Sequence, residues 1–304
     1  MPPHHAGHVA PVTSAPTPMT SAMQNAMVDK YNNVRFSFAQ QMSKMEALVP
    51  PDLRWPCLKR LPASDWHGHS SRTTNHTRHG GSQMGEDLFM HKYFFSGGEW
   101  DCKNKTTIQN RGCEEHWPTY MELGANDGLA MSNSLFFERK LGWHGVLIEA
   151  IPRYCQSLVA HRCENNVVAC GAVCTAEMSG KGNLTLLDAG AASGSAAMGT
   201  SALHLAMYEK GANKKKYVSV PCAPLSAMLA NAGVQRIDLL SLDVEMQEKG
   251  VLETVDFQAV RFGVLLIEAP CKDELSDAAI VGPLLESHGY SYVARHGGMN
   301  AKLM

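Results

Sequence analysis

Two glutamates, Glu122 and Glu149, stand at the ends of two apolar runs in this sequence, 120–123 and 146–148. Between the runs, the segment 124–128 is Gly-Ala-Asn-Asp-Gly, whose residues tolerate positive φ and let a ligand approach the backbone. A carboxylate beside such a turn would repel a pyrophosphate and attract a cation. The pattern therefore predicts a site for a cofactor that carries positive charge and no phosphate.

S-adenosylmethionine is such a cofactor, because it has a sulfonium and an ammonium group, and one carboxylate can accept both hydroxyls of its ribose. We predict that the residues of the turn and the two acids bind it: Glu122, Gly124, Asn126, Asp127, Gly128 and Glu149. The turn lacks the G-x-G-x-x-G spacing that binds a pyrophosphate, which argues against the alternative of a nucleotide-dependent oxidoreductase. A structural alternative is that the acids cap strand ends and the glycines only turn the chain.

Two further acids, Asp243 and Glu245, follow the apolar run 237–242. Methyl transfer to an alcohol needs the acceptor oxygen in line with the sulfonium and a base for its proton. Asp243 and Glu245 are our candidates for that base or for positioning the acceptor, and Asp243 should also lie near the cofactor. His204 is a third candidate base, although a lone histidine on a helix is more often structural. Asp243 and Glu245 could also cap the following helix, where a carboxylate near the helix N-terminus contributes about 0.3 to 1 kcal/mol of stability. That structural role is compatible with the other two.

These side chains can act together only if a sheet brings them to one edge. Apolar runs without alternation predict buried parallel strands at 120–123, 146–148, 166–170, 237–242 and 262–267. Helical segments separate them, which indicates a doubly wound α/β domain that binds ligands at the carboxyl ends of its strands. If the strands pair in order, Cys170 and Gly171 would lie near the adenine of the cofactor. A hairpin arm is expected at 180–188 and a last strand at 290–295.

The motifs ELGANDG, SNSLFFERKLGWHGVLIEA and IDLLSLDVEMQEKGVLETVDF resemble the FkbM-type S-adenosylmethionine-dependent methyltransferases. The segment 82–95 is similar to the start of that family's domain, which would pack across the cofactor site, with Gln83 and Asp87 helping to order it. The resemblance spans roughly 82–296. It implies a Rossmann-like sheet of about seven strands, with the last strand antiparallel, and a carbohydrate or glycosylated metabolite as the hydroxyl acceptor.

The resemblance leaves a non-enzymatic function open. Some proteins that carry this domain look like secretory-pathway trafficking or regulatory factors that keep the methyltransferase fold. The family usually has a glycine after the acidic pair, whereas Met246 and Gln247 follow Glu245 here. Cofactor binding without turnover would favour this alternative.

The composition, 304 residues with 44% hydrophobic and 18% charged, suits one domain with a tail. We expect a largely disordered extension at 1–81 that could hold an amphipathic helix at 27–48, and a methyltransferase-like domain at 82–304. The net charge of -2 gives no reason to expect nucleic acid as a partner, and no apolar stretch is long enough to span a bilayer. The histidines at 67–79 lack the close cysteines of a zinc site, so we expect no metal.

The sequence has nine cysteines and no C-x-x-C pair. Cys102 and Cys113 could close a loop in an oxidising compartment. The others that we considered lie in apolar surroundings typical of buried thiols: Cys155, Cys163, Cys170, Cys174, Cys222 and Cys271. Three N-x-[ST] sequons, at Asn75, Asn104 and Asn183, would permit glycosylation in a secretory compartment, while the first residues lack the pattern of a secretory signal. The cytoplasm and the secretory lumen both remain open.

Overall fold

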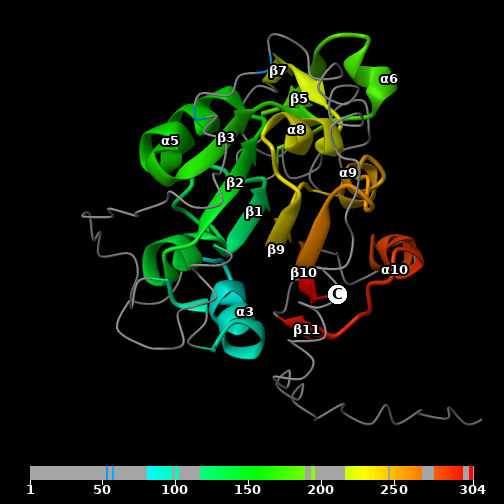
Figure 1. Cartoon of the computed structure of the whole chain (residues 1–304). Coiled ribbons are helices and arrows are strands. Elements are labelled where there is room, and N and C mark those ends of the chain that lie inside the picture. The colour runs from blue at the N-terminus through cyan, green and yellow to red at the C-terminus, as the bar shows by residue number, and fades with distance from the viewer. Residues whose placement is uncertain are drawn as a thin grey trace, which may run out of the picture.

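The computed structural model describes residues 53, 57, 81–97, 100–102, 117–188, 193–195, 216–245, 247–268, 277–296 and 301–303. At its centre is a seven-stranded sheet in the order β11-β12-β10-β9-β1-β2-β3 (Figure 1). Five neighbouring strands are parallel: β1 (Thr119–Leu123), β2 (His144–Glu149), β3 (Asn166–Cys170), β9 (Arg236–Leu242) and β10 (Arg261–Glu268). They contain the five apolar runs of the sequence, which confirms those strand predictions.

The order of the parallel strands reverses at β1. The chain passes from β1 to β2 and β3 on one side, and β9 and β10 then lie on the other side of β1. In such sheets the ends of the two central strands separate the loops that follow them and leave a crevice for a ligand. The fold therefore places the candidate site at the carboxyl ends of β1, β2 and β9.

The strand that pairs antiparallel with β10 is β12 (Ala301–Leu303), and β11 (Ala294–His296) pairs antiparallel with β12. A last strand of the chain that runs antiparallel to its parallel neighbour is thus confirmed, but its position is corrected. The sequence places it at 290–295, where the structure has only the start of β11. Short edge strands with polar residues lack the apolar run that marks the buried strands, which explains the error.

Alternate residues of the parallel strands face two separate cores, so the sheet is covered on both faces. Val146 and Ile148 face one core, and Leu147 between them faces the other. The first core packs against α8 (Leu225–Asn231), α9 (Glu248–Leu252) and α10 (Asp277–Ser287). The second packs against α3 (Glu86–Phe94), the π-helix η4 (Phe137–Leu141) and α5 (Pro152–Arg162), as Figure 1 allows the reader to follow. The α/β class and the doubly wound arrangement are confirmed.

A smaller region packs beside the end of β3. It contains an antiparallel sheet in the order β6-β5-β7, formed by β6 (Gly194–Ser195), β5 (Leu184–Leu187) and β7 (Tyr217–Val220). Beside it, β4 (Ala172–Val173) pairs with β8 (Cys222–Ala223), and the short helices η5 (Cys163–Asn165) and α6 (Ala176–Ser179) complete the connections. The expected arm at 180–188 therefore exists as β5, which lies between two partner strands.

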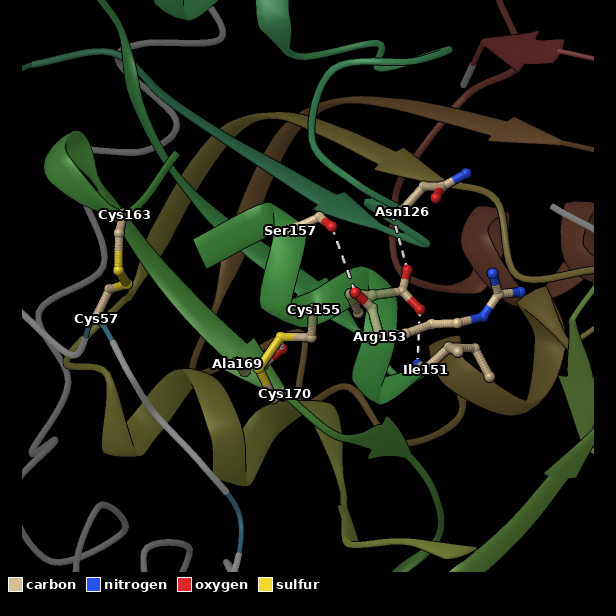
Figure 2. Close-up of a disulfide and its surroundings, with 10 residues drawn as sticks. Cys57, Asn126, Ile151, Arg153, Cys155, Ser157, Cys163, Ala169 and Cys170 are labelled. Atoms are coloured by element: carbon tan, nitrogen blue, oxygen red, sulfur yellow. Dashed lines mark hydrogen bonds between the residues drawn. A yellow bond between two sulfur atoms is a disulfide. The ribbon is translucent and has the colours of Figure 1, made fainter. Parts of the chain in front are cut away.

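Three disulfides correct the expectation of buried thiols: Cys57–Cys163, Cys155–Cys170 and Cys174–Cys222. Their Cα–Cα distances are 5.5, 5.6 and 5.7 Å, within the range that a disulfide requires. Figure 2 shows the first two, of which the second links α5 to β3. Apolar surroundings suit a buried thiol and a buried disulfide equally, so the sequence pattern could not separate them. Cys102 is disulfide-bonded as well, whereas Cys113 and Cys271 lie outside the described residues.

Leu53 and Cys57 come from the expected extension at 1–81 and are both buried against the domain. The expected helix at 27–48 and the histidines at 67–79 lie outside the described residues. Among the helices that the structure describes, none is long and apolar enough to cross a membrane.

Candidate functional site

The turn after β1 packs directly against the end of β9. The amide of Gly124 donates to the carbonyl of Ile148 at 3.1 Å, and the amide of Asp243 donates to the carbonyl of Leu123 at 3.3 Å. Gly124 has φ 77°, and a Cβ at this position would clash with the carbonyl oxygen of Asp243. Only glycine combines this backbone conformation with so close an approach. The turn thus brings Asp243 beside the ends of β1 and β2.

Glu149, the last residue of β2, is buried and is held by two backbone amides. Its Oε2 accepts from the amide of Asn126 at 2.8 Å, and its Oε1 accepts from the amide of Ile151 at 2.7 Å. Burial raises the pKa of Glu149 to about 7, although these amides act in the opposite direction. Each carboxylate oxygen keeps a lone pair for a further donor. The group is therefore fixed in place and still able to accept two hydroxyls.

Glu122 has a different set of partners, all from the segment 132–134 of the same chain. Its Oε1 accepts from the amide of Asn133 at 2.8 Å. Its Oε2 accepts from the hydroxyls of Ser132 at 2.8 Å and Ser134 at 2.5 Å. Glu122 thus holds the loop beside the turn in position, and direct contact with a cofactor stays a prediction for this residue.

The last two predicted residues of the turn also contact the chain itself. Asp127 accepts from the amides of Leu129 and Ala130 at 2.9 and 2.8 Å, which shapes the turn. Gly128 has φ 79°, and its carbonyl accepts from Nη1 of Arg162 at 2.7 Å. The backbone of the turn is therefore fixed at both ends.

Sequence reasoning missed the buried network around Arg162, which lies at the end of α5 and is fully enclosed. Its Nε donates to Oε2 of Glu138 at 2.5 Å, and its Nη2 donates to the hydroxyl of Tyr120 at 2.8 Å. Burial opposes ionisation of Glu138, but Arg162 and hydrogen bonds from Tyr120 and Asn166 hold its pKa below the usual value. One signal was present in the sequence. Arg162 lies four residues after the buried Leu158 and so on the same face of the helix.

Three carboxylates gather at the ends of β9 and β10. Oxygens of Asp243, Glu245 and Glu268 all lie within 4.8 Å of one another. Burial, a hydrogen bond with Glu268 and the neighbouring carboxylates raise the pKa of Asp243 well above its usual value. Burial and Glu268 raise the pKa of Glu245 to about 7. Clusters of oxygens can also bind Mg²⁺ or Ca²⁺, but nothing besides this proximity indicates a cation here.

Sequence reasoning did not assign Glu268 to the site. The signal was available, because Glu268 ends β10 as Glu149 ends β2, and the carboxyl ends of parallel strands share one edge.

Comparison with protein families decides which family these motifs represent. A family model described as the methyltransferase FkbM domain matches residues 122–292. The chain belongs to the FkbM methyltransferase family. No curated protein and no solved structure matches it. The matched part of the FkbM domain includes the glycine turn, Glu149 and the three carboxylates, while the segment 82–121 lies before it.

The FkbM domain has a pocket beside the carboxylate cluster, closed on one side by the start of α3. It is lined by Gln83, Met84, Glu86, Met131, Asn133, Ser241, Leu242, Asp243, Leu266 and Glu268. Asp87 orders this segment, because its carboxylate accepts from the amide of Gly81 at 2.7 Å and from the hydroxyl of Ser82 at 2.6 Å. The start of this element therefore lines the pocket beside the carboxylate cluster, and its packing across a bound cofactor stays a prediction.

Within the described residues, three non-glycine residues have positive φ, and all lie around this edge of the FkbM domain. They are Asn126 at 50°, Met131 at 59° and Glu245 at 57°. Such conformations cost on the order of 1 kcal/mol or more and cluster at functional sites. Where the family usually has glycine just after the acidic pair, this chain instead places Glu245 itself in the left-handed region. Met246 lies outside the described residues.

Three further residues were predicted for the site from the sequence: Cys170, Gly171 and His204. Cys170 pairs with Glu149 in the sheet, as the strand order requires, but its sulfur is bonded to Cys155. The amide of Gly171 donates to the carbonyl of Glu149 at 3.1 Å. His204 lies outside the described residues, so its role as a base stays a prediction.

Proposed function

We propose that this FkbM-family chain is an S-adenosylmethionine-dependent O-methyltransferase that acts on a hydroxyl of a carbohydrate or glycosylated metabolite. One observation carries the proposal. The glycine turn separates two acids with different surroundings, the buried Glu149 held by backbone amides and the partly buried Asp243 beside two other carboxylates. Glu149 suits a neutral diol and the cluster of three carboxylates suits positive charge, which matches the ribose and the sulfonium and ammonium groups of this cofactor.

The hydrogen bonds that hold Glu149 leave it suited to bind the ribose of the cofactor. Its oxygens are held by Asn126 and Ile151, and their remaining lone pairs can accept the two ribose hydroxyls. The positive φ angles in the turn 124–128 let a ligand approach the backbone closely. The turn itself contains no basic residue that could bind a phosphate. When bound, S-adenosylmethionine supplies an electrophilic methyl group.

Glu245 is the proposed general base. With a pKa of about 7, its carboxylate is available near neutral pH and still basic enough to take the proton of an acceptor hydroxyl. Burial and a hydrogen bond with Glu268 raise the pKa of Asp243 well above its usual value. We assign Asp243 to positioning groups beside the cofactor and Glu245 to exchanging the proton.

The alternative function, a non-catalytic protein with this fold, is favoured by the missing glycine after Glu245. The left-handed conformation of Glu245 argues against it, because a strained carboxylate within a cluster of acids is costly to keep without a use. A further prediction separates the two functions: the alternative requires cofactor binding with no methyl transfer.

Calorimetric titration with S-adenosylmethionine and S-adenosylhomocysteine tests the cofactor site. Glu149→Gln should weaken binding about tenfold or more, since a hydrogen bond to a charged group contributes about 1.5 to 3 kcal/mol. Glu177→Gln is the matched control, because Glu177 is exposed on α6 and pairs only with Lys181 among the residues described. No binding by the folded wild-type protein would refute the proposal.

Turnover is then measured as release of S-adenosylhomocysteine in the presence of sugars and other alcohols. Methylation of a hydroxyl by the wild-type protein, lost in Glu245→Gln, supports the O-methyltransferase. Binding of the cofactor with no product from any acceptor moves the conclusion to the non-catalytic alternative.

A further inference from the structure

The cysteines of this domain are paired across its fold. All seven described cysteines are disulfide-bonded, and the three bridges with described partners join residues 106, 15 and 48 positions apart. Disulfides of this kind form and persist in oxidising compartments and are rare in the cytosol. The structure therefore indicates folding in an oxidising compartment.

One sequon lies in the described part of the chain, Asn183-Leu184-Thr185. Asn183 is exposed in the loop before β5, and Thr185 is the outward-facing residue of that strand. Leu184 between them is buried, because successive side chains of a strand point to opposite faces. The asparagine and the hydroxyl of the sequon are thus both on the solvent side.

The surface around Asn183 is open. The neighbouring Gly182 has φ 102°, and a Cβ placed on it would meet no other atom within 4 Å. The nearby ion pair of Lys181 with Glu177 is formed by side chains that are 70% and 77% exposed. A glycan is bulky and polar and needs such a solvated position.

From the disulfides and this geometry together, we propose that Asn183 carries an N-linked glycan and that the protein matures in an oxidising secretory compartment. The proposal does not depend on methyl transfer. It turns the sequon, which by itself is a weak signal, into a specific modification site.

A glycan at Asn183 is compatible with a working site. Strand β5 runs from Leu184 to Leu187, and Asp188 after it forms a two-pronged contact with Arg153, near Glu149. Asn183 is at the opposite end of the strand, roughly 16 Å away at about 3.3 Å per residue. The glycan would therefore project from the arm and leave the carboxyl edge of the central sheet free.

The test expresses the full chain in cultured eukaryotic cells and measures two quantities on the purified protein. Mass spectrometry after peptide N-glycosidase treatment reports whether Asn183 was glycosylated, and alkylation without reduction reports how many cysteines are free. We expect a modified Asn183 in the wild-type protein and no free thiol among the seven described cysteines.

Two substitutions at Thr185 provide matched variants. Thr185→Ser keeps the sequon and should keep the glycan, whereas Thr185→Val keeps a β-branched strand residue and should abolish it. In a background with Asn75→Gln and Asn104→Gln, the shift in gel mobility caused by the glycosidase should be lost with Thr185→Val and retained with Thr185→Ser. An unmodified Asn183 in the wild-type protein overturns the proposal, whether or not the disulfides have formed. Free thiols among the seven described cysteines of freshly isolated protein overturn the inferred compartment.

Discussion

Nη1 of Arg162 donates to the carbonyl of Gly128 at 2.7 Å, so a residue at the end of α5 fixes the turn that follows β1. The same guanidinium is paired with Glu138, and both side chains are buried. The shape of the candidate cofactor site therefore depends on an ion pair that lies behind it.

Removing the Arg162 side chain should be strongly destabilising. Arg162→Met leaves Glu138 buried without its cation, a change that typically costs about 3 to 5 kcal/mol of unfolding free energy. The double variant Arg162→Met with Glu138→Leu should recover much of this loss, because no buried charge remains. Urea denaturation measures both, and a single variant that loses less than about 1 kcal/mol would show that the pair does not hold the domain together.

The free energy of unfolding should fall as the pH rises from 5 to 8, partly because of Glu149. The pKa of Glu149 is about 7 in the folded state, above its ordinary value of 4.5, so folded protein binds more protons between these values. The stability that this proton contributes, about 3 kcal/mol at most, is present at low pH and is lost as the pH passes 7. Asp243 and Glu245 act in the same direction. Denaturation of the ligand-free protein at several pH values should show a smaller slope in Glu149→Gln, and equal slopes would contradict the raised pKa.

If Glu245 is the base, the methylation rate should increase as the pH rises through about 7, where its carboxyl ionises. Glu245→Gln should lower kcat on the order of 10²-fold or more and leave cofactor affinity nearly unchanged. Glu253→Gln serves as the control, because Glu253 is about half exposed and pairs with Lys249. A pH profile that is the same in wild-type protein and Glu245→Gln would assign the proton transfer to another group.

Two glycine substitutions separate backbone strain from close packing. Gly124 and Gly182 both have positive φ, but only Gly124 would bring a Cβ against the carbonyl of Asp243. Gly182→Ala should cost roughly 1 kcal/mol from conformation alone, while Gly124→Ala should cost more and also weaken cofactor binding. Thermal denaturation and calorimetry measure the two effects, and equal losses of stability would mean that the turn can move away from β9.

Removing each disulfide should lower stability, but only one of the two removals should also lower cofactor affinity. In the chain-entropy description, removing Cys155–Cys170 costs about 3 kcal/mol and removing Cys174–Cys222 costs about 4, because the second closes the longer loop. Only the first is adjacent to Glu149, through Cys170. Paired serine variants should therefore both lower the melting temperature, whereas cofactor affinity should decrease only for the Cys155–Cys170 pair. An equal loss of affinity in both would indicate a general loosening of the domain.

Much of this architecture could be predicted because a buried parallel strand is an apolar run in the sequence, whichever strands lie beside it. Glu149 and Asp243 follow such strands, and the rule that their carboxyl ends meet at one edge is enough to bring them together. The same rule applied to β10 would have added Glu268. The family resemblance supplied the antiparallel strand, but not its position near the end of the chain.

The contacts that sequence reasoning missed join residues far apart in the chain. Tyr120 and Arg162 are 42 positions apart, and Cys57 and Cys163 are 106 apart. Composition and periodicity report which side chains are buried, not which buried side chains meet. The interior position of Arg162 could be inferred from its helix face, but its partners could not, because they come from β1, the turn and loop after it, η4 and β3.

Glu245 also sets a limit on how far the domain can be stabilised by engineering. Replacing a left-handed residue with glycine is an ordinary way to relieve backbone strain, and at φ 57° it should be favourable here. The same replacement would remove the carboxylate that we propose as the base. Selection for heat resistance and selection for turnover should therefore choose different residues at this position, and a collection of thermostable variants enriched in glycine at 245 should be depleted in activity.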